Sequence, residues 1–418
     1  MALGTRNAVS SPLPENAPRR KQRGFGRTAD TLLGYTLVVG LRLSLGGLVL
    51  PLYLYSLGYQ QFIIGVVTAA GAVTTLVFAV PLGLLADRVG RARLFVISAW
   101  LLPLPTLGTA FSTNLGVIIA CQMVVNLIAT VYWSTNAPLL VGSVSSEQRV
   151  RVFAMNSFFL TGIGTLGAAL GGGISTLAGR VLGVSSSATV PLRIALIAVA
   201  VLALIGALPL SRLHTAPEKA ARERAWRFTR ADIPLFGKLI VVDALMAFGA
   251  GAVIGFLPIF FKLRFGLESG ALGLLFTVMG ALSGVASLMA PLIARRLGDL
   301  RALLVAQIII APAILFIALA PVLPLALVFE AARNSLRGWL DPVYTPFAMT
   351  RVPSAQRGAL GGLYNVTWAT GFSLGPLASG WIQEHAGFAP AFTMSAVCYL
   401  VAAVCTFTFF RGGRTNEN

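Results

Sequence analysis

The chain has 418 residues, of which 56% are hydrophobic and 11% are charged, and its mean hydropathy is +0.82. A soluble domain carries roughly 25% charged residues, so this composition excludes an ordinary globular protein. The formal net charge of +18 does not indicate nucleic-acid binding, because the basic residues are scattered through short segments between apolar stretches. We therefore expect an all-α integral membrane protein whose spanning helices each need about 20 apolar residues.

Twelve apolar stretches follow one another along the chain. Residues 1–30 are polar and basic and predict a disordered cytoplasmic tail. The predicted spans are 31–57, 61–85, 92–112, 115–142, 152–178, 190–210, 234–262, 269–293, 301–319, 322–348, 358–383 and 388–410. Mixed charges in residues 211–233 predict a cytoplasmic central loop with a short amphipathic helix on the membrane surface. The predicted domains are two six-helix bundles, 31–210 and 234–410, followed by a cytoplasmic tail at 411–418.

The distribution of Lys and Arg predicts the topology. If both termini are cytoplasmic, 24 of these residues lie in cytoplasmic tails and loops, and four lie outside: Arg180, Arg193, Lys262 and Arg264. Positive residues concentrate on the cytoplasmic side of membrane proteins. We therefore expect a multi-pass protein of the plasma or inner membrane with both ends in the cytoplasm.

An internal repeat supports the division into two halves. An offset of 208 residues places several glycines, an arginine and an asparagine of the first half on identical residues of the second. The matched pairs include Gly58 and Gly266, Gly65 and Gly273, Gly90 and Gly298, Arg93 and Arg301, and Asn126 and Asn334. Two parallel six-helix halves imply a pseudo-twofold axis along the membrane normal and a binding site between the halves.

The loop after the second span carries a specific motif. Residues 83–93 read GLLADRVGRAR, and a degenerate copy at Pro291–Arg301 has Arg295 where the first has an acidic residue. The motif resembles the G-x-L-a-D-r-x-G-r-r/k signature of the major facilitator superfamily, which implies a twelve-helix bundle of two halves. The resemblance also implies that the motif latches the outward-open state through Asp87, with Gly83, Arg88, Gly90, Arg91 and Arg93. The alternative is a positively charged cytoplasmic loop without a latch.

Ionisable residues inside the spans are the strongest candidates for a functional site. A charge in the membrane costs about 2.5–3.5 kcal/mol, so it persists when it faces water or a partner. The resemblance implies that helices 1, 4, 7 and 10 line a central cavity, and every such charge falls on one of these helices. The predicted substrate and proton pathway contains Arg42, Gln122, Asn126, Trp133, Asn136, Asp243, Glu330, Arg333, Asn334, Arg337 and Asp341.

The charges of the tenth span have two interpretations. Glu330 with Arg333, and Arg337 with Asp341, form either a self-neutralising ladder or a ladder that exchanges partners during transport. Asp243 has no basic residue one turn away on its own helix, which suits a proton carrier, because burial raises the pKa of a carboxyl group. Arg42 is the alternative counter-charge for Asp243.

These observations predict a secondary transporter working by alternating access, with proton-coupled efflux of small organic compounds as the first hypothesis. The alternatives are an uptake symporter or facilitator for a sugar or other nutrient, and a non-transporting sensor or lipid-handling protein. A glycine-rich stretch, Gly371–Gly380, resembles a motif of antiporters but also suits close helix packing. We expect a monomer in the lipid bilayer that is not an enzyme, uses a proton or ion gradient, and has no cofactor, metal site or nucleic-acid partner.

Overall fold

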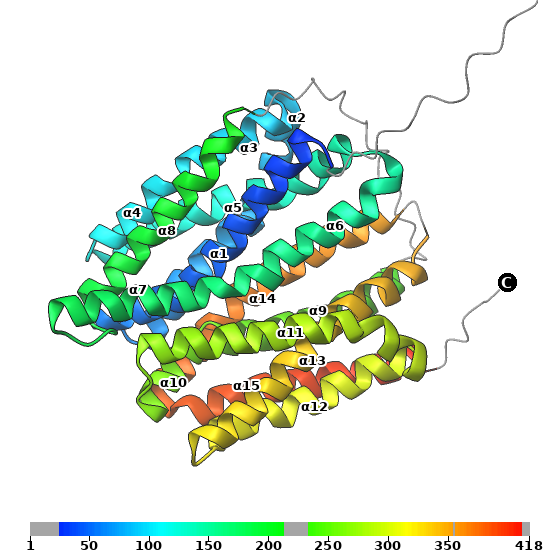
Figure 1. The fold of residues 1–418 in the computed structure, drawn as a ribbon. Helices are drawn as coiled ribbons and strands as arrows, with labels where there is room; N and C mark the ends of the chain where they lie inside the picture. Colours follow the sequence, from blue (N-terminus) through cyan, green and yellow to red (C-terminus); the bar gives the residue numbers. More distant parts are fainter. Residues whose placement is uncertain (1–24, 213–232, 354–355, 412–418) are drawn as a thin grey trace, which may run out of the picture.

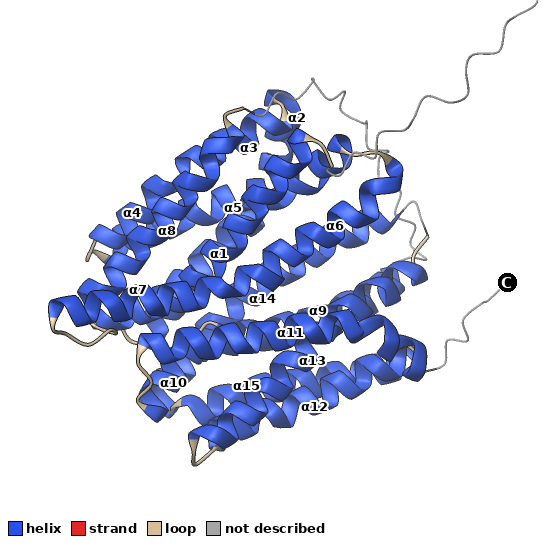
Figure 2. Cartoon of the chain, in the orientation of Figure 1, coloured by secondary structure: helices blue, strands red, loops and turns tan. Residues whose placement is uncertain are grey.

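The computed structural model describes residues 25–212, 233–353 and 356–411, and their regular structure is helical (Figure 2). The helices of the N-terminal half are α1 (Arg27–Ser56), α2 (Gln61–Val89), α3 (Arg91–Leu101), α4 (Pro103–Phe111), α5 (Leu115–Ser143), α6 (Arg149–Ser157), α7 (Leu166–Leu182) and α8 (Thr189–Leu210). Those of the C-terminal half are α9 (Ile233–Ile254), α10 (Leu257–Phe265), α11 (Ser269–Leu297), α12 (Asp299–Leu319), α13 (Leu323–Arg351), α14 (Arg357–Ala386) and α15 (Phe388–Phe410). The predicted surface helix of the central loop lies outside the described residues.

Ten helical segments within the described ranges are long and apolar enough to cross a membrane. α13 and α14, with 29 and 30 residues, are equally long but less apolar, because α13 carries the predicted charges and α14 is rich in glycine. Together these segments follow the order of the predicted spans. The all-α membrane fold expected from the sequence is confirmed.

The helix boundaries repeat with the spacing found in the sequence. α2 and α11 each have 29 residues and begin 208 residues apart, and the same is true of α5 and α13. Gly90 follows α2 with a φ of 100°, and Gly298 follows α11 with a φ of 77°. Residues that have a Cβ rarely adopt a positive φ, so both loops require glycine at the equivalent position.

Three predicted continuous spans are interrupted in the structure. The span 92–112 divides into α3 and α4, the span 234–262 divides into α9 and α10, and the span 152–178 is irregular in its centre. A π-helical turn at Phe158–Gly162 and a 3₁₀ turn at Ile163–Thr165 separate α6 from α7. Gly40 of α1 packs here, where an added Cβ would lie 2.9 Å from the carbonyl oxygen of Phe159. The irregular backbone therefore packs directly against Gly40, which has no side chain. Hydropathy alone does not predict such a turn.

The two halves are in contact through α7 with α11 and through α2 with α14 (Figure 1). The α7–α11 contact runs from Thr176 and Gly270 near the predicted external end to Ala169 and Thr277 nearer the centre. The α2–α14 contact brings the beginning of α2 against the second half of α14. Gly172 of α7 lies against the backbone of Ser269 and Gly273, and Gly380 of α14 lies against that of Gln61. The largest buried apolar cluster also joins the halves, since it contains α1 and α10.

Two glycines of the stretch that resembles an antiporter motif pack α14 closely against α9. Within α14, an added Cβ at Gly371 would lie 2.5 Å from the backbone carbon of Ala247, and one at Gly375 would lie 2.6 Å from the oxygen of Phe248. Both neighbours belong to α9. The structure thus gives Gly371 and Gly375 a packing role within the C-terminal half, whereas Gly380 at the end of the stretch packs against α2 of the other half.

The α7–α11 crossing can be tested with two adjacent alanine substitutions. Gly172→Ala would force a methyl group into the α11 backbone and should destabilise the protein by about 1–3 kcal/mol. Gly173→Ala is the matched control, because its added methyl group meets no atom within 4 Å. Thermal unfolding in detergent should show a lower midpoint for Gly172→Ala alone. Equal midpoints for the two variants would contradict the observed crossing.

Candidate functional site

The loop motif lies where α2 ends and α3 begins. Gly90 alone separates the two helices, Arg88 and Arg93 are exposed, and Arg91 is half-buried. The side chain of Asp87 lies outside the described part of the structure, so its latch role stays a prediction. Among the described residues, an added Cβ at Gly83 would meet no atom within 4 Å, so no described neighbour requires glycine at that position.

A buried ion pair lies in the first half of α13. Arg333 donates from Nε to Oε2 of Glu330 over 2.7 Å, and a second hydrogen bond joins Arg333 Nη2 to Glu330 Oε1. Arg333 is 5% exposed and Glu330 is 1% exposed. The bidentate geometry offsets the cost of removing both charges from water. This pair corresponds to the first half of the predicted ladder.

Arg337, one turn further along α13, contacts aromatic side chains of other helices. Its Cζ lies 4.5 Å from the centre of the Trp368 ring on α14, and Nη1 donates to the hydroxyl oxygen of Tyr399 on α15 over 3.4 Å. The side chain of Asp341 lies outside the described part, so the second half of the ladder stays a prediction. Sequence reasoning missed Trp368 and Tyr399, because their helices follow α13 and no spacing rule brings them to Arg337.

Asn334, also on α13, donates to the main-chain oxygen of Met279 on α11. The bond ties the two helices together in the middle of the C-terminal half. It occupies one donor of the amide that the sequence placed in the pathway.

Asp243 and Arg42 lie in separate polar surroundings, each within its own half. Asp243 of α9 is 3% exposed. Its carboxylate interacts electrostatically with the hydroxyl groups of Tyr344 on α13 and Tyr364 on α14. Arg42 of α1 is 7% exposed, and its guanidinium group interacts electrostatically with Tyr35 and Tyr132. The Nε atom of Arg42 is buried and has no hydrogen-bond partner among the described residues. The structure therefore gives Arg42 neighbours in its own half rather than Asp243.

The polar side chains of α5 make contacts with different neighbouring residues. Gln122 donates to Thr109 Oγ1 of α4 over 3.1 Å, and Asn126 donates to the main-chain oxygen of Gln122 over 2.9 Å. Trp133 is 56% exposed. Of the predicted stripe on this helix, Trp133 is the side chain with the greatest exposed surface.

Asn136 belongs to a buried polar cluster that the sequence analysis did not assign. Its Nδ2 donates to Oδ1 of Asn156 on α6 over 3.1 Å, and Thr36 of α1 donates to the same oxygen over 2.8 Å. Tyr132 in turn donates to Thr36 Oγ1 over 3.2 Å. The cluster links α1, α5 and α6 beside Arg42. The one available signal for Asn156 was its match to Asn365, which needs an offset of 209 residues, one more than the earlier pairs of the repeat.

Comparison with known proteins identifies the family to which this arrangement of helices and the loop motif belong. The sequence profile of the Major Facilitator Superfamily matches residues 32–332 and 244–418. The chain belongs to the Major Facilitator Superfamily. The loop motif predicted this family, whose members are membrane transporters. No curated protein matches the chain by sequence. Within the described residues of this family member, no group of three His, Cys, Asp or Glu is placed to hold a metal ion.

Solved structures of the superfamily share this fold at low sequence identity. A bacterial homologue of the human lysosomal transporter Spinster, in an inward-facing and unoccupied conformation, has a TM-score of 0.76 and 15% identity, covering 93% of this chain and 98% of its own. A D-xylose–proton symporter has a TM-score of 0.74 and 14% identity, covering 91% and 97%. The nucleoside transporter NupG has a TM-score of 0.69 and 17% identity, covering 92% and 100%.

The buried pair on α13 can be tested with a double-mutant cycle. Glu330→Gln should destabilise the protein by about 3–5 kcal/mol, because it leaves the buried Arg333 charge without its carboxylate. The double variant Glu330→Gln/Arg333→Gln removes both charges and should recover much of the loss. Thermal unfolding of the two single variants and the double variant measures this coupling. Additive losses in the double variant would mean that the pair does not act as a unit.

Proposed function

We propose that this chain is a secondary transporter that exports small organic compounds across the cell membrane in exchange for protons. Membership of the transporter superfamily supports secondary transport. The observation that supports proton coupling is Asp243, a carboxyl group almost completely buried in a membrane helix beside two tyrosine hydroxyl groups. Such a group is costly in lipid unless it serves transport or has a partner.

The mechanism that we propose is alternating access by two bundles, residues 31–210 and 234–410. The external contacts of α7 with α11 and of α2 with α14 close one end of the site between them. We assign the structure to the externally closed state on this ground. In the opposite state the bundles would separate here and meet at the predicted cytoplasmic end, where the loop motif lies.

The residues of the pathway have distinct proposed roles. Asp243 carries the proton, and Arg337 with Trp368 presents a cation and an aromatic face to the substrate. Trp133 provides a second aromatic surface from the opposite half. Glu330, Arg333, Asn334 and Asp341 form the charged wall of the C-terminal half, and Arg42, Gln122, Asn126 and Asn136 form the polar wall of the N-terminal half.

Gly83 supports the latch hypothesis for the loop motif. Since its missing side chain is not explained by any neighbour in the externally closed state, we infer that a helix of the other half approaches Gly83 in the outward-open state. Asp87 would make its pairing in that state, with Arg88, Gly90, Arg91 and Arg93 shaping the loop. Both termini would lie in the cytoplasm, and the protein would act as a monomer.

A second candidate function is proton-coupled uptake of a nutrient. It is favoured by the similarity of the fold to a D-xylose–proton symporter and to a nucleoside transporter. A sensor or lipid-handling protein on the same fold is the third candidate. Purified protein in liposomes, tested with a pH-sensitive dye against drugs, sugars, nucleosides and amino acids, separates them. Efflux predicts that substrate and protons move in opposite directions, uptake predicts the same direction, and movement of neither contradicts both.

Proton coupling is tested directly by Asp243→Asn. This substitution preserves the size of the side chain but cannot release a proton. We expect gradient-driven accumulation of substrate in liposomes to fall at least about tenfold, while exchange of labelled for unlabelled substrate continues. Asp30→Asn, an exposed aspartate at the start of α1, is the control and should retain accumulation. Full accumulation by Asp243→Asn would remove this residue from the proton pathway.

The latch is tested at Gly83 and Asp87. Gly83→Ala adds a Cβ that meets no described atom within 4 Å, so it should leave the unfolding midpoint unchanged while slowing transport. Asp87→Asn should also slow turnover in a folded protein. Rates from the liposome assay, beside thermal unfolding, check both statements. Unchanged turnover in the two variants would show that the loop does not latch a transport state.

A further inference from the structure

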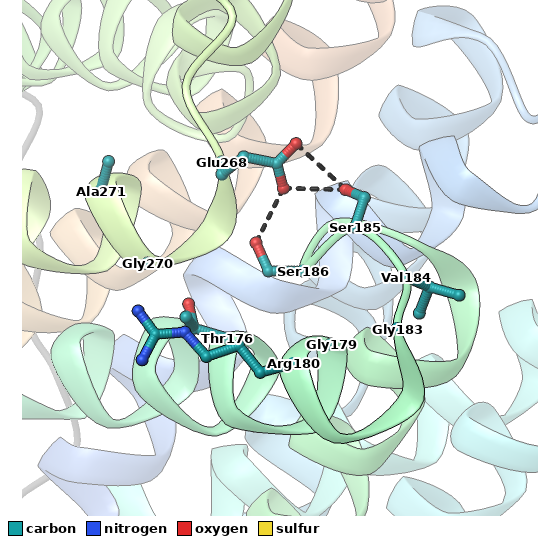
Figure 3. A pocket seen from close by; sticks show the side chains of 10 residues that line it. All are labelled: Thr176, Gly179, Arg180, Gly183, Val184, Ser185, Ser186, Glu268, Gly270 and Ala271. Atoms are coloured by element: carbon teal, nitrogen blue, oxygen red, sulfur yellow. Dashed lines mark hydrogen bonds between the residues drawn. The ribbon is translucent and has the colours of Figure 1, made fainter.

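Glu268 joins the two halves at the predicted external end, and it receives hydrogen bonds from a run of three serines. Figure 3 shows two of them, Ser185 and Ser186, beside the carboxylate. Ser185 donates to Glu268 Oε2 over 2.8 Å, and Ser186 donates to the same oxygen over 2.7 Å. The main-chain N–H of Ser187 donates to it over 3.2 Å. Glu268 precedes α11 in the C-terminal half, whereas the serines lie between α7 and α8 in the N-terminal half. One carboxylate therefore gathers three donors across the boundary.

The same contact continues into the interior beneath Glu268. The hydroxyl oxygens of Ser187 and Ser269 are 2.9 Å apart and buried, and Ser269 Oγ also donates to the main-chain oxygen of Ser186 over 3.2 Å. Further in, Thr277 of α11 accepts a hydrogen bond from the main-chain N–H of Ala169 over 3.0 Å. These hydrogen bonds connect the two halves along the α7–α11 crossing, from its external end to its centre.

Electrostatics favour the ionised form of Glu268 in this position. Burial opposes ionisation, but hydrogen bonds from Ser186 and Ser185, the charge of Lys262 and the Ser187 bond together hold the pKa of Glu268 below its ordinary value. Hydrogen bonds to a charged acceptor are about twice as strong as neutral ones. The serine run therefore binds a carboxylate rather than a neutral acid.

The other crossing between the halves has a weaker version of this contact. Glu384, near the end of α14, accepts a hydrogen bond from the main-chain N–H of Phe62 at the start of α2 over 3.2 Å. By the 208-residue repeat, Gln60 stands where the second half has Glu268. The repeat therefore does not account for Glu268, and the serine cluster is particular to the α7–α11 side.

We propose that Glu268, Ser185, Ser186 and Ser187 form an external clasp that stabilises the externally closed state of the transporter. Opening the external end would separate the carboxylate from its donors and expose the Ser187–Ser269 pair. The clasp would thus oppose the cytoplasmic loop motif, whose predicted latch stabilises the other state. This inference rests on the alternating access proposed above.

The test measures the distance between the two external ends. Spin labels at Thr113→Cys, between α4 and α5, and at Val322→Cys, before α13, report on this distance in a background with Cys121, Cys398 and Cys405 replaced by serine. Pulsed electron–electron resonance in nanodiscs gives the populations of short and long distances. Glu268→Gln should raise the ratio of long to short distances about fivefold, because it removes one partly exposed charge-assisted contact.

Ser185→Ala/Ser186→Ala removes the donors, keeps the charge and should act in the same direction. This serine double variant tests the clasp independently if the Glu268→Gln variant does not fold. Glu147→Gln, an exposed carboxylate at the opposite end, is the matched control and should leave the populations unchanged. Two populations that respond to neither clasp variant would overturn the clasp alone. A single distance in the native protein and every variant, with and without substrate, would overturn alternating access as well.

Discussion

The close backbone crossings between the halves set the geometry of this protein. At Gly172 and Gly273, and again at Gly65 and Gly380, helices of opposite halves approach without side chains between them. Lipid provides little hydrophobic drive for helix association, so small residues and interhelical hydrogen bonds supply the contact. Because both crossings lie at the same end, they hold the halves together there in this structure. Under the proposed alternating access, the halves separate at this end in the opposite state.

The positions of the buried charges agree with this division. The Glu330–Arg333 pair lies within one helix, and Arg42 and Asp243 interact with tyrosines of their own halves. Breaking a buried ion pair costs about 3–5 kcal/mol, whereas an exposed charged contact is worth far less. Among the described residues, the hydrogen bonds across the boundary involve Glu268, Glu384, several serines and Thr277, from the predicted external end to the centre of the α7–α11 crossing. Relative movement of the halves therefore leaves these costly buried contacts in place.

Much of the fold, but less of the site, could be predicted from the sequence. Hydropathy gave spans close to the observed helices, and the 208-residue repeat reappears in the bounds of α2 and α11. The π-helical turn after Ser157 leaves no mark in hydropathy. Arg337 stacks on Trp368 from another helix, which spacing along α13 does not reveal. Glu268 and its serines resemble an ordinary polar loop until the two halves are assembled.

The central claim is that the two halves enclose an aqueous passage that opens to one side at a time. Trp133→Cys, at a 56% exposed position on the predicted passage wall, tests it with a membrane-impermeant thiol reagent. We expect labelling from the predicted cytoplasmic side, reduced when substrate or a clasp variant shifts the protein to the outward-open state. Val404→Cys on α15, 62% exposed, is expected to face lipid and to stay unlabelled. Absence of labelling at position 133 from either side would contradict the account.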